Sequence, residues 1–98
     1  MSEKVPVDQD LKALIPIFMD NREEDITKLK ELLAESDLEG IKRVGHNLKG
    51  TGGGYGFDKI TELGRQIEEA AKEENEDSLE ELIAELEIYL EEVEITYE

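Results

Sequence analysis

Apolar residues recur at intervals of three and four positions along most of the chain, and this spacing is typical of amphipathic helices. The stretches are joined by short connections, which favour neighbouring helices that run antiparallel. No stretch alternates apolar and polar residues in the manner that predicts a strand. The pattern predicts an all-α fold: an antiparallel up-down four-helix bundle over residues 8–98, with a short kinked helix at its front and a flexible arm over residues 1–7.

The predicted core consists of the apolar residues on one side of each helix. In chain order these are Leu11, Leu14, Ile15 and Phe18; Ile26, Leu29 and Leu33; Ile41, Val44, Leu48 and Tyr55; Ile60, Leu63, Ile67 and Ala71; and Leu79, Leu82, Leu86, Leu90 or Tyr89, Val93 and Tyr97. The last set approaches a heptad spacing. We expect it to pack inside the bundle and not between chains, because the bundle needs that face for its core, so a monomer is expected.

Residues that begin or end helices set the expected boundaries. Pro16 lacks an amide donor and crowds the preceding turn, so it should kink the first helix. Gly56 should end the helix that carries Tyr55. The expected N-terminal caps are Asp8, Asn21 with Glu24, Asp37, Asp58, and Asp77 with Glu80.

The composition narrows the range of functions. The chain has 98 residues, one histidine, no cysteine and a formal net charge of −16. The absence of cysteine excludes disulfides, thiol nucleophiles and cysteine-based metal sites, and a single histidine excludes sites that need two imidazoles. No metal site is therefore expected. The negative charge repels nucleic acid and anionic membranes, so neither is expected as a partner.

The N-terminal sequence contains no hydrophobic signal core, and the longest nearly apolar run, residues 13–19, is too short to span a membrane. A cytoplasmic protein is expected.

One stretch departs from the acidic pattern. Residues 40–57 contain no acid and three bases, Lys42, Arg43 and Lys49, so their local charge is +3. The other eight bases and all 27 acids leave −19 on the rest of the chain. This segregation of charge indicates a segment with a function of its own.

The only histidine lies in this basic stretch. On a helical wheel, Ile41, Val44 and Leu48 mark the side that faces the core, and His46 lies roughly 150° from the centre of that side. His46 should therefore point to solvent. The residues that share its outer side are Lys42, Arg43, Gly50 and Gly53, with Lys49 on the flank. On position alone, an ordinary solvated histidine stays an open alternative.

Glycines are concentrated in the same stretch, at positions 45, 50, 52, 53 and 54. Each costs about 0.8–1 kcal/mol relative to alanine inside a helix, so together they cost roughly 4–5 kcal/mol. Either the helix ends near Lys49 and a loop follows, or bare backbone leaves room for a bulky group beside His46. Gly50, one turn after His46, suits the second role, whereas Gly45 and Gly52 point toward the core and favour close helix packing.

An exposed imidazole can attack phosphorus and form a phosphoramidate. Phosphoryl transfer then requires positioning and positive charge near the transferred oxygens, which nearby lysines supply. The chain has no Gly-Lys-Ser/Thr loop after a strand and so lacks a nucleotide site of its own. These features predict a phosphocarrier that depends on a partner's active site, and not a self-sufficient kinase or another enzyme.

The motif HNLKGT at residues 46–51, with Gly56 ten residues after the histidine, resembles the signature of histidine phosphotransfer (HPt) domains. Residues 49–57 are also similar to the phosphotransfer domain of chemotaxis histidine kinases. Leu63 and Glu68 in the following helix, and the all-helical plan, agree with the resemblance. Gly45 stands where the family commonly has alanine, and residues 52–54 are unusually rich in glycine, so a looser helix end is expected.

The resemblance implies that Nε2 of His46 takes a phosphoryl group from a phospho-aspartate on one receiver domain and gives it to another. It also implies that Lys49 lies near the phosphoryl oxygens and that Gly50 leaves space beside the ring. Mg²⁺ would be bound in the acidic pocket of the receiver, and this chain would need no cofactor.

The implied partners are response-regulator receiver domains and a histidine kinase or hybrid kinase. Lys42, Arg43 and Gly53 would contact them, and the basic residues would aid encounter with an acidic pocket. Two alternatives stay open. A helical module could bind receivers or kinases without carrying phosphate, or the chain could be the phosphoacceptor domain of a larger kinase, although Met1 and the short arm favour a complete small protein.

Overall fold

The computed structural model describes residues 4–98. This part of the chain contains four long helices, α1 (Ile15–Ala34), α2 (Leu38–Gly52), α3 (Asp58–Lys72) and α4 (Glu76–Glu92). It also contains two 3₁₀ turns, η1 (Gln9–Leu14) and η2 (Gly53–Tyr55), and two strands, β1 (Lys4–Val7) and β2 (Glu94–Tyr97). The prediction of a helical bundle is confirmed, and the prediction that no strand would form is wrong.

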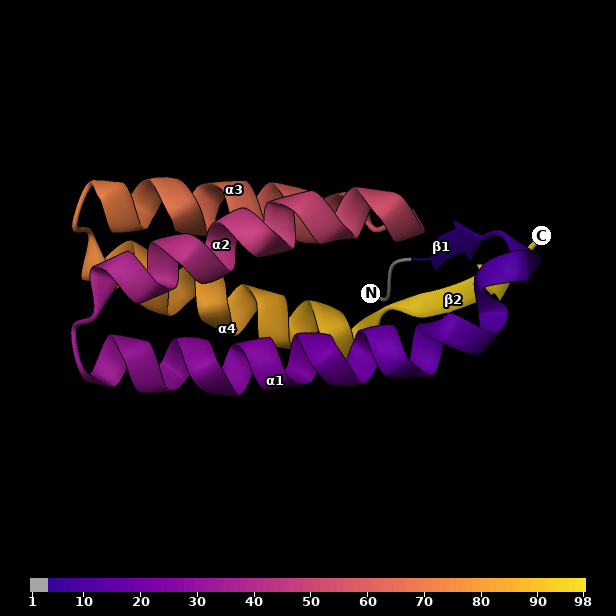
Figure 1. Cartoon of the computed structure of the whole chain (residues 1–98), viewed down its shortest axis with the longest axis horizontal. Helices are drawn as coiled ribbons and strands as arrows, with labels where there is room; N and C mark the ends of the chain where they lie inside the picture. Colours follow the sequence, from indigo (N-terminus) through magenta and orange to yellow (C-terminus); the bar gives the residue numbers. More distant parts are fainter. Residues whose placement is uncertain (1–3) are drawn as a thin grey trace.

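The four helices lie side by side along the long axis of the molecule, and the chain reverses direction after α1, after α2 and after α3 (Figure 1). Each helix contributes a fully buried side chain to the core, and these include Leu29, Ile41, Leu63 and Leu86. Phe57, which precedes α3, is also fully buried, and its ring stacks on that of Phe18 with 5.0 Å between centroids. The small sheet lies at the end of the molecule where α1 begins (Figure 1).

Two helices begin at side-chain caps. Asp37 precedes α2 and accepts a hydrogen bond from the amide of Gly40 at 3.0 Å, as predicted. Asn75 precedes α4 and accepts one from the amide of Ser78 at 3.1 Å. The predicted cap at Asp77 is therefore wrong by two residues, because the amide side chain of Asn75 already satisfies the first turn.

The sequence predicts a short helix kinked at Pro16, followed by a second helix that begins at Asn21. The structure differs from both predictions. A single helix, α1, runs from Ile15 to Ala34. Pro16 falls in its first turn, where an amide hydrogen has no helical acceptor and the fixed φ of proline suits a helix. Pro16 therefore starts a helix and does not kink one. Asp8 caps η1, where it accepts a hydrogen bond from the amide of Asp10 at 2.8 Å.

Residues 4–7, which the sequence assigned to a flexible arm, form β1. This strand pairs in parallel with β2, with Val5 opposite Ile95 and Val7 opposite Tyr97. Val5 and Val7 are 6% and 2% exposed, so their side chains belong to the core. The loose arm is therefore a wrong prediction for residues 4–7, and residues 1–3 lie outside the described part.

The last helix ends earlier than predicted, because the residues after it form the strand that pairs with β1. Val93 already has an extended backbone, with ψ of 134°. The following residues form β2 with burial that alternates along the strand. Val93 and Tyr97 therefore do not continue the apolar stripe of α4. Pairing with β1 satisfies backbone groups that a frayed helix end would leave to water.

The glycine-rich end of α2 remains helical. The helix extends to Gly52 and continues as η2, so the interpretation that it ends near Lys49 is wrong. Gly56 then stops the helix, as predicted, with φ of +86°. This left-handed conformation costs glycine no steric strain.

Helices α2 and α3 approach each other closely at three glycines. A Cβ on Gly45 would lie 2.8 Å from the backbone nitrogen of Glu68, and one on Gly64 would lie 2.5 Å from the backbone nitrogen of Lys49. Gly52 is confined in the same way. The prediction that Gly45 and Gly52 serve close packing is confirmed, and the close contact places Glu68 of α3 beside His46 and Lys49 of α2.

Candidate functional site

His46 lies midway along α2, on the side away from the core. Its side chain is 64% exposed, whereas Val44 and Leu48 on the same helix are buried. Each residue of an α-helix is rotated by about 100° from the one before, so positions two before and two after a residue lie on the opposite side. The prediction that His46 points to solvent is confirmed.

A carboxylate from α3 holds two side chains of α2. Oε2 of Glu68 lies 3.2 Å from Nδ1 of His46, and Oε1 accepts a hydrogen bond from Nζ of Lys49 at 2.9 Å. Glu68 itself is only 8% exposed. Because each carboxylate oxygen has its own partner, the orientation of the carboxylate is fixed between the two side chains.

The charge of Glu68 determines which ring nitrogen of His46 carries the hydrogen. The hydrogen bond from Lys49 holds the pKa of Glu68 below its ordinary value of 4.5, although burial opposes the shift. Glu68 is therefore ionised at neutral pH and can only accept hydrogen bonds. Nδ1 must donate to it, so the lone pair of the neutral ring lies on Nε2, on the solvent side.

The lowered pKa of Glu68 makes part of the folding stability depend on pH. The folded-state pKa lies below 4.5, so this contribution is complete above that value and is lost as the pH falls through the folded-state pKa. We expect the free energy of unfolding of the wild type to decrease more steeply below pH 4.5 than that of Glu68→Gln. Urea unfolding at a series of pH values measures both, and parallel curves would contradict this expectation.

Gly50 lies one turn after His46 on the same surface. A Cβ at this position would meet no atom within 4 Å. The fold therefore does not require glycine here, and glycine weakens the helix by about 1 kcal/mol relative to alanine. This combination favours a requirement for open space beside the imidazole.

The remaining predicted residues surround His46 without joining its cluster. Lys42 pairs with Glu39 at 3.6 Å on the exposed side of α2. Arg43 and Gly53 are exposed. Within residues 4–98, none of these three shares a hydrogen bond or ion pair with His46. Of the predicted residues, only Lys49 is linked to His46, because both contact the carboxylate of Glu68.

Glu68 agrees with the HPt resemblance but is not among the predicted site residues, whereas the structure places it at the centre of the cluster. The sequence contains one further signal. Glu68 follows Ile67 and lies one turn after Gly64, so it borders the apolar side of its helix. An acid in that position needs a partner when it is buried, but the register that pairs it with His46 depends on the packing of α2 against α3.

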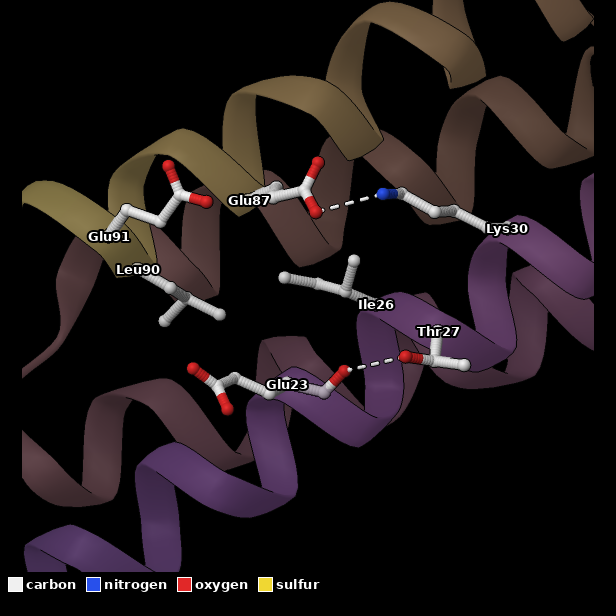
Figure 2. A pocket seen from close by; sticks show the side chains of 7 residues that line it. All are labelled: Glu23, Ile26, Thr27, Lys30, Glu87, Leu90 and Glu91. Atoms are coloured by element: carbon white, nitrogen blue, oxygen red, sulfur yellow. Dashed lines mark hydrogen bonds and ion pairs between the residues drawn. The ribbon is translucent and has the colours of Figure 1, made fainter.

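A hollow elsewhere on the molecule is unrelated to these residues. It lies between α1 and α4, where Ile26 and Leu90 form its apolar part and Lys30 bridges to Glu87 at 2.8 Å (Figure 2). None of the predicted site residues lines it. The candidate site is instead centred on His46, whose side chain is 64% exposed on the surface of α2.

The Hpt domain family model matches residues 13–96, which is nearly the whole chain. The chain therefore belongs to the Hpt domain family. Hpt domains are phosphocarrier modules of two-component signalling and are not kinases. No curated protein and no solved structure matches the chain. In the described residues, no helix has both the length and the apolar character needed to cross a bilayer.

Proposed function

We propose that this chain is a histidine-containing phosphotransfer protein of a two-component phosphorelay, in which His46 carries a phosphoryl group between phospho-aspartates of receiver domains. The observation that carries the proposal is the 3.2 Å contact between Glu68 and Nδ1 of His46. It favours an imidazole whose exposed Nε2 is the nucleophile. Membership in the Hpt domain family supports the same reaction.

In the proposed reaction, the Nε2 lone pair attacks the phosphorus of a receiver's acyl phosphate in line with the leaving oxygen. The N–P bond forms as the P–O bond breaks, and the aspartate leaves as a carboxylate. No proton has to leave Nε2. The phosphorylated ring retains the hydrogen on Nδ1 and gains a positive charge, which Glu68 balances from 3.2 Å. Attack by the aspartate of the next receiver reverses these steps.

Lys49 supplies positive charge beside the reacting nitrogen. Its side chain is 38% exposed, and its flexible stem allows Nζ to turn from Glu68 toward the phosphoryl oxygens. The receiver supplies Mg²⁺ from its own acidic pocket, so this chain needs no cofactor. Lys42 and Arg43 favour the approach of that acidic pocket, and Gly53 lies on the same partner surface.

The partners in this proposal are response-regulator receiver domains and a histidine kinase or hybrid kinase. The protein acts as a cytoplasmic monomer that brings the phosphoacceptor, while each receiver brings the catalytic pocket. The strongly acidic composition supports protein partners over nucleic acid or an anionic membrane.

Replacing Gly50 with leucine should slow phosphotransfer by about tenfold or more, because the new side chain would occupy the approach to Nε2. The temperature of unfolding should stay the same or rise, since a Cβ at this position meets no atom within 4 Å and leucine favours the helix. Transfer rates and thermal melts of both proteins test this together. Equal transfer rates would refute the role of Gly50 in clearance.

The proposal is tested by incubating the wild type and His46→Gln with a phosphorylated receiver domain and Mg²⁺. Radiolabelled phosphate should move from the receiver to the wild type and not to His46→Gln, and both proteins should show the same circular dichroism melt, because the side chain is 64% exposed. A variant that fails to fold would favour a structural histidine. Receiver binding without transfer would favour the binding-only module.

A further inference from the structure

A groove, here called the α1–α4 groove, runs along the bundle between α1 and α4. It consists of two hollows, with volumes of about 190 Å³ and about 480 Å³, and Lys30 lines both of them. Ile26 and Leu90 line the first hollow, which Figure 2 shows, and Leu33 lines the second. The two hollows are therefore neighbours, and the groove has apolar side chains in each of them.

The charged side chains of the α1–α4 groove are almost all acidic. In the described chain, seven charged residues line the two hollows, and six of these are acids: Glu23, Glu76, Asp77, Glu80, Glu87 and Glu91. The one base, Lys30 of α1, pairs with Glu87 of α4 at 2.8 Å (Figure 2). Within residues 4–98, none of the other five acids forms an ion pair. The groove therefore keeps a negative charge that the described chain does not balance.

Lys30 illustrates how a cationic side chain fits this groove. It extends from one helix and donates a hydrogen bond to a carboxylate of the other. The aliphatic stem of a lysine or arginine covers apolar surface while the charged head pairs with an acid. Glu23 of α1 and Glu91 of α4 face the first hollow from opposite helices and are exposed. A cationic side chain from another protein can therefore bind between them over the apolar residues.

The length of the α1–α4 groove suits a short helix. Glu23 and Ala34 line different hollows, and the part of α1 between them is about 16 Å long. Amphipathic helices bind such grooves through apolar residues that are three, four and seven positions apart, which span about 10 Å. A helix with these apolar residues and with basic residues beside them would match the groove in length, apolar contact and charge.

We propose that the α1–α4 groove is a docking surface for a basic amphipathic helix of a protein partner. A second copy of this chain fits less well, because two copies each carry a formal charge of −16 and repel one another. Every residue that lines the groove belongs to α1 or α4, whereas His46 and Glu68 belong to α2 and α3. A helix bound in the groove therefore leaves His46 uncovered. This inference goes beyond the proposed function, since it concerns how the chain is held and not how it carries phosphate.

The probe is a synthetic helical peptide of about 14 residues, with leucines three and four positions apart and lysines elsewhere. The groove variant combines Glu23→Gln with Glu91→Gln. The control variant combines Glu24→Gln with Glu92→Gln, which removes the same charge from the same helices at exposed positions outside the groove. Titrations followed by fluorescence anisotropy should give the groove variant a Kd about tenfold higher than the wild type. The Kd of the control variant should stay within about twofold of the wild type, because salt screens distant charges.

A scrambled peptide of the same composition separates the groove from net charge alone, because its leucines no longer lie on one side. It should bind the wild type at least about tenfold more weakly than the amphipathic peptide. Equal binding of the two peptides, or equal losses in the groove and control variants, would overturn the docking surface. Sedimentation that shows a dimer of the wild type and a monomer of the groove variant would assign the groove to a second copy and also overturn it. Neither measurement depends on phosphotransfer, so the proposed function stands or fails separately.

Discussion

Replacing Gly64 with alanine is expected to destabilise the fold by about 2–4 kcal/mol, although alanine favours a helix over glycine by about 1 kcal/mol. The added methyl group would lie 2.5 Å from the backbone nitrogen of Lys49 and 2.8 Å from the carbonyl oxygen of Gly45. These backbone atoms belong to a hydrogen-bonded helix, so they can move away from the methyl group only if the helix moves with them. Helices α2 and α3 must therefore separate along their contact, and the apolar side chains around it lose packing.

The matched control is Gly50→Ala, the same chemical change on the neighbouring helix. Its methyl group would meet no atom within 4 Å, so the gain in helix propensity should stabilise the protein by up to about 1 kcal/mol. Chemical unfolding of both variants gives the two free energies. Equal stabilities would mean that the contact between α2 and α3 does not require glycine at position 64.

Replacing Glu68 with glutamine is expected to slow phosphotransfer more than replacing it with alanine, by roughly 100-fold against roughly tenfold. In the wild type, Lys49 donates a hydrogen bond to Oε1 of Glu68. The other carboxylate oxygen, Oε2, faces Nδ1 of His46. In the glutamine variant, Lys49 would keep the amide oxygen on its own side and turn the amide nitrogen toward Nδ1. That nitrogen donates, so it would favour a hydrogen on Nε2 and remove the lone pair that attacks phosphorus.

Rates of transfer from a phosphorylated receiver to the wild type, Glu68→Gln and Glu68→Ala measure this order. A double variant with Lys49→Met and Glu68→Gln is the control, because without Lys49 the amide is free to turn its oxygen toward His46. Its rate is compared with that of Lys49→Met alone, and in this background Glu68→Gln should slow transfer by a smaller factor than it does in the wild type. Glutamine and alanine variants with equal rates would show that Glu68 does not act through the tautomer of His46.

The helices could be predicted because their signals are local. Apolar spacing of three and four residues defines a buried side wherever the chain is helical, and Asp37 and Gly56 each act within their own turn. Pro16 illustrates the limit of a local signal, since proline both starts and kinks helices. Which role applies depends on where the helix begins, and here η1 precedes it.

The two strands could not be predicted from local pattern. Each is four residues long, and β1 contains Pro6, which ordinarily argues against a strand. Each strand forms because the other end of the chain lies beside it, with Val5 opposite Ile95. Such pairing depends on where the bundle places the first and last helices, which no short window of sequence contains.

The candidate site also combines features that the local sequence predicts with one that depends on how the helices pack. The outward direction of His46 and the bare position at Gly50 follow from the helical period and from residue types, and both appear in the structure. The role of Glu68 does not follow from them, because it depends on the exact register of α3 against α2. That register is fixed by glycines on both helices, and the sequence predicted their packing role only for Gly45 and Gly52 on α2.

The site of phosphorylation is measured most directly by nuclear magnetic resonance of the chain after phosphorylation by a receiver domain with Mg²⁺, with ¹⁵N in the imidazole and detection of ³¹P. We expect a single acid-labile phosphoryl group bonded to Nε2 of His46, with the hydrogen retained on Nδ1 facing Glu68. A phosphoryl group on Nδ1, or an acid-stable phosphate on a serine or threonine, would contradict the proposed role of His46.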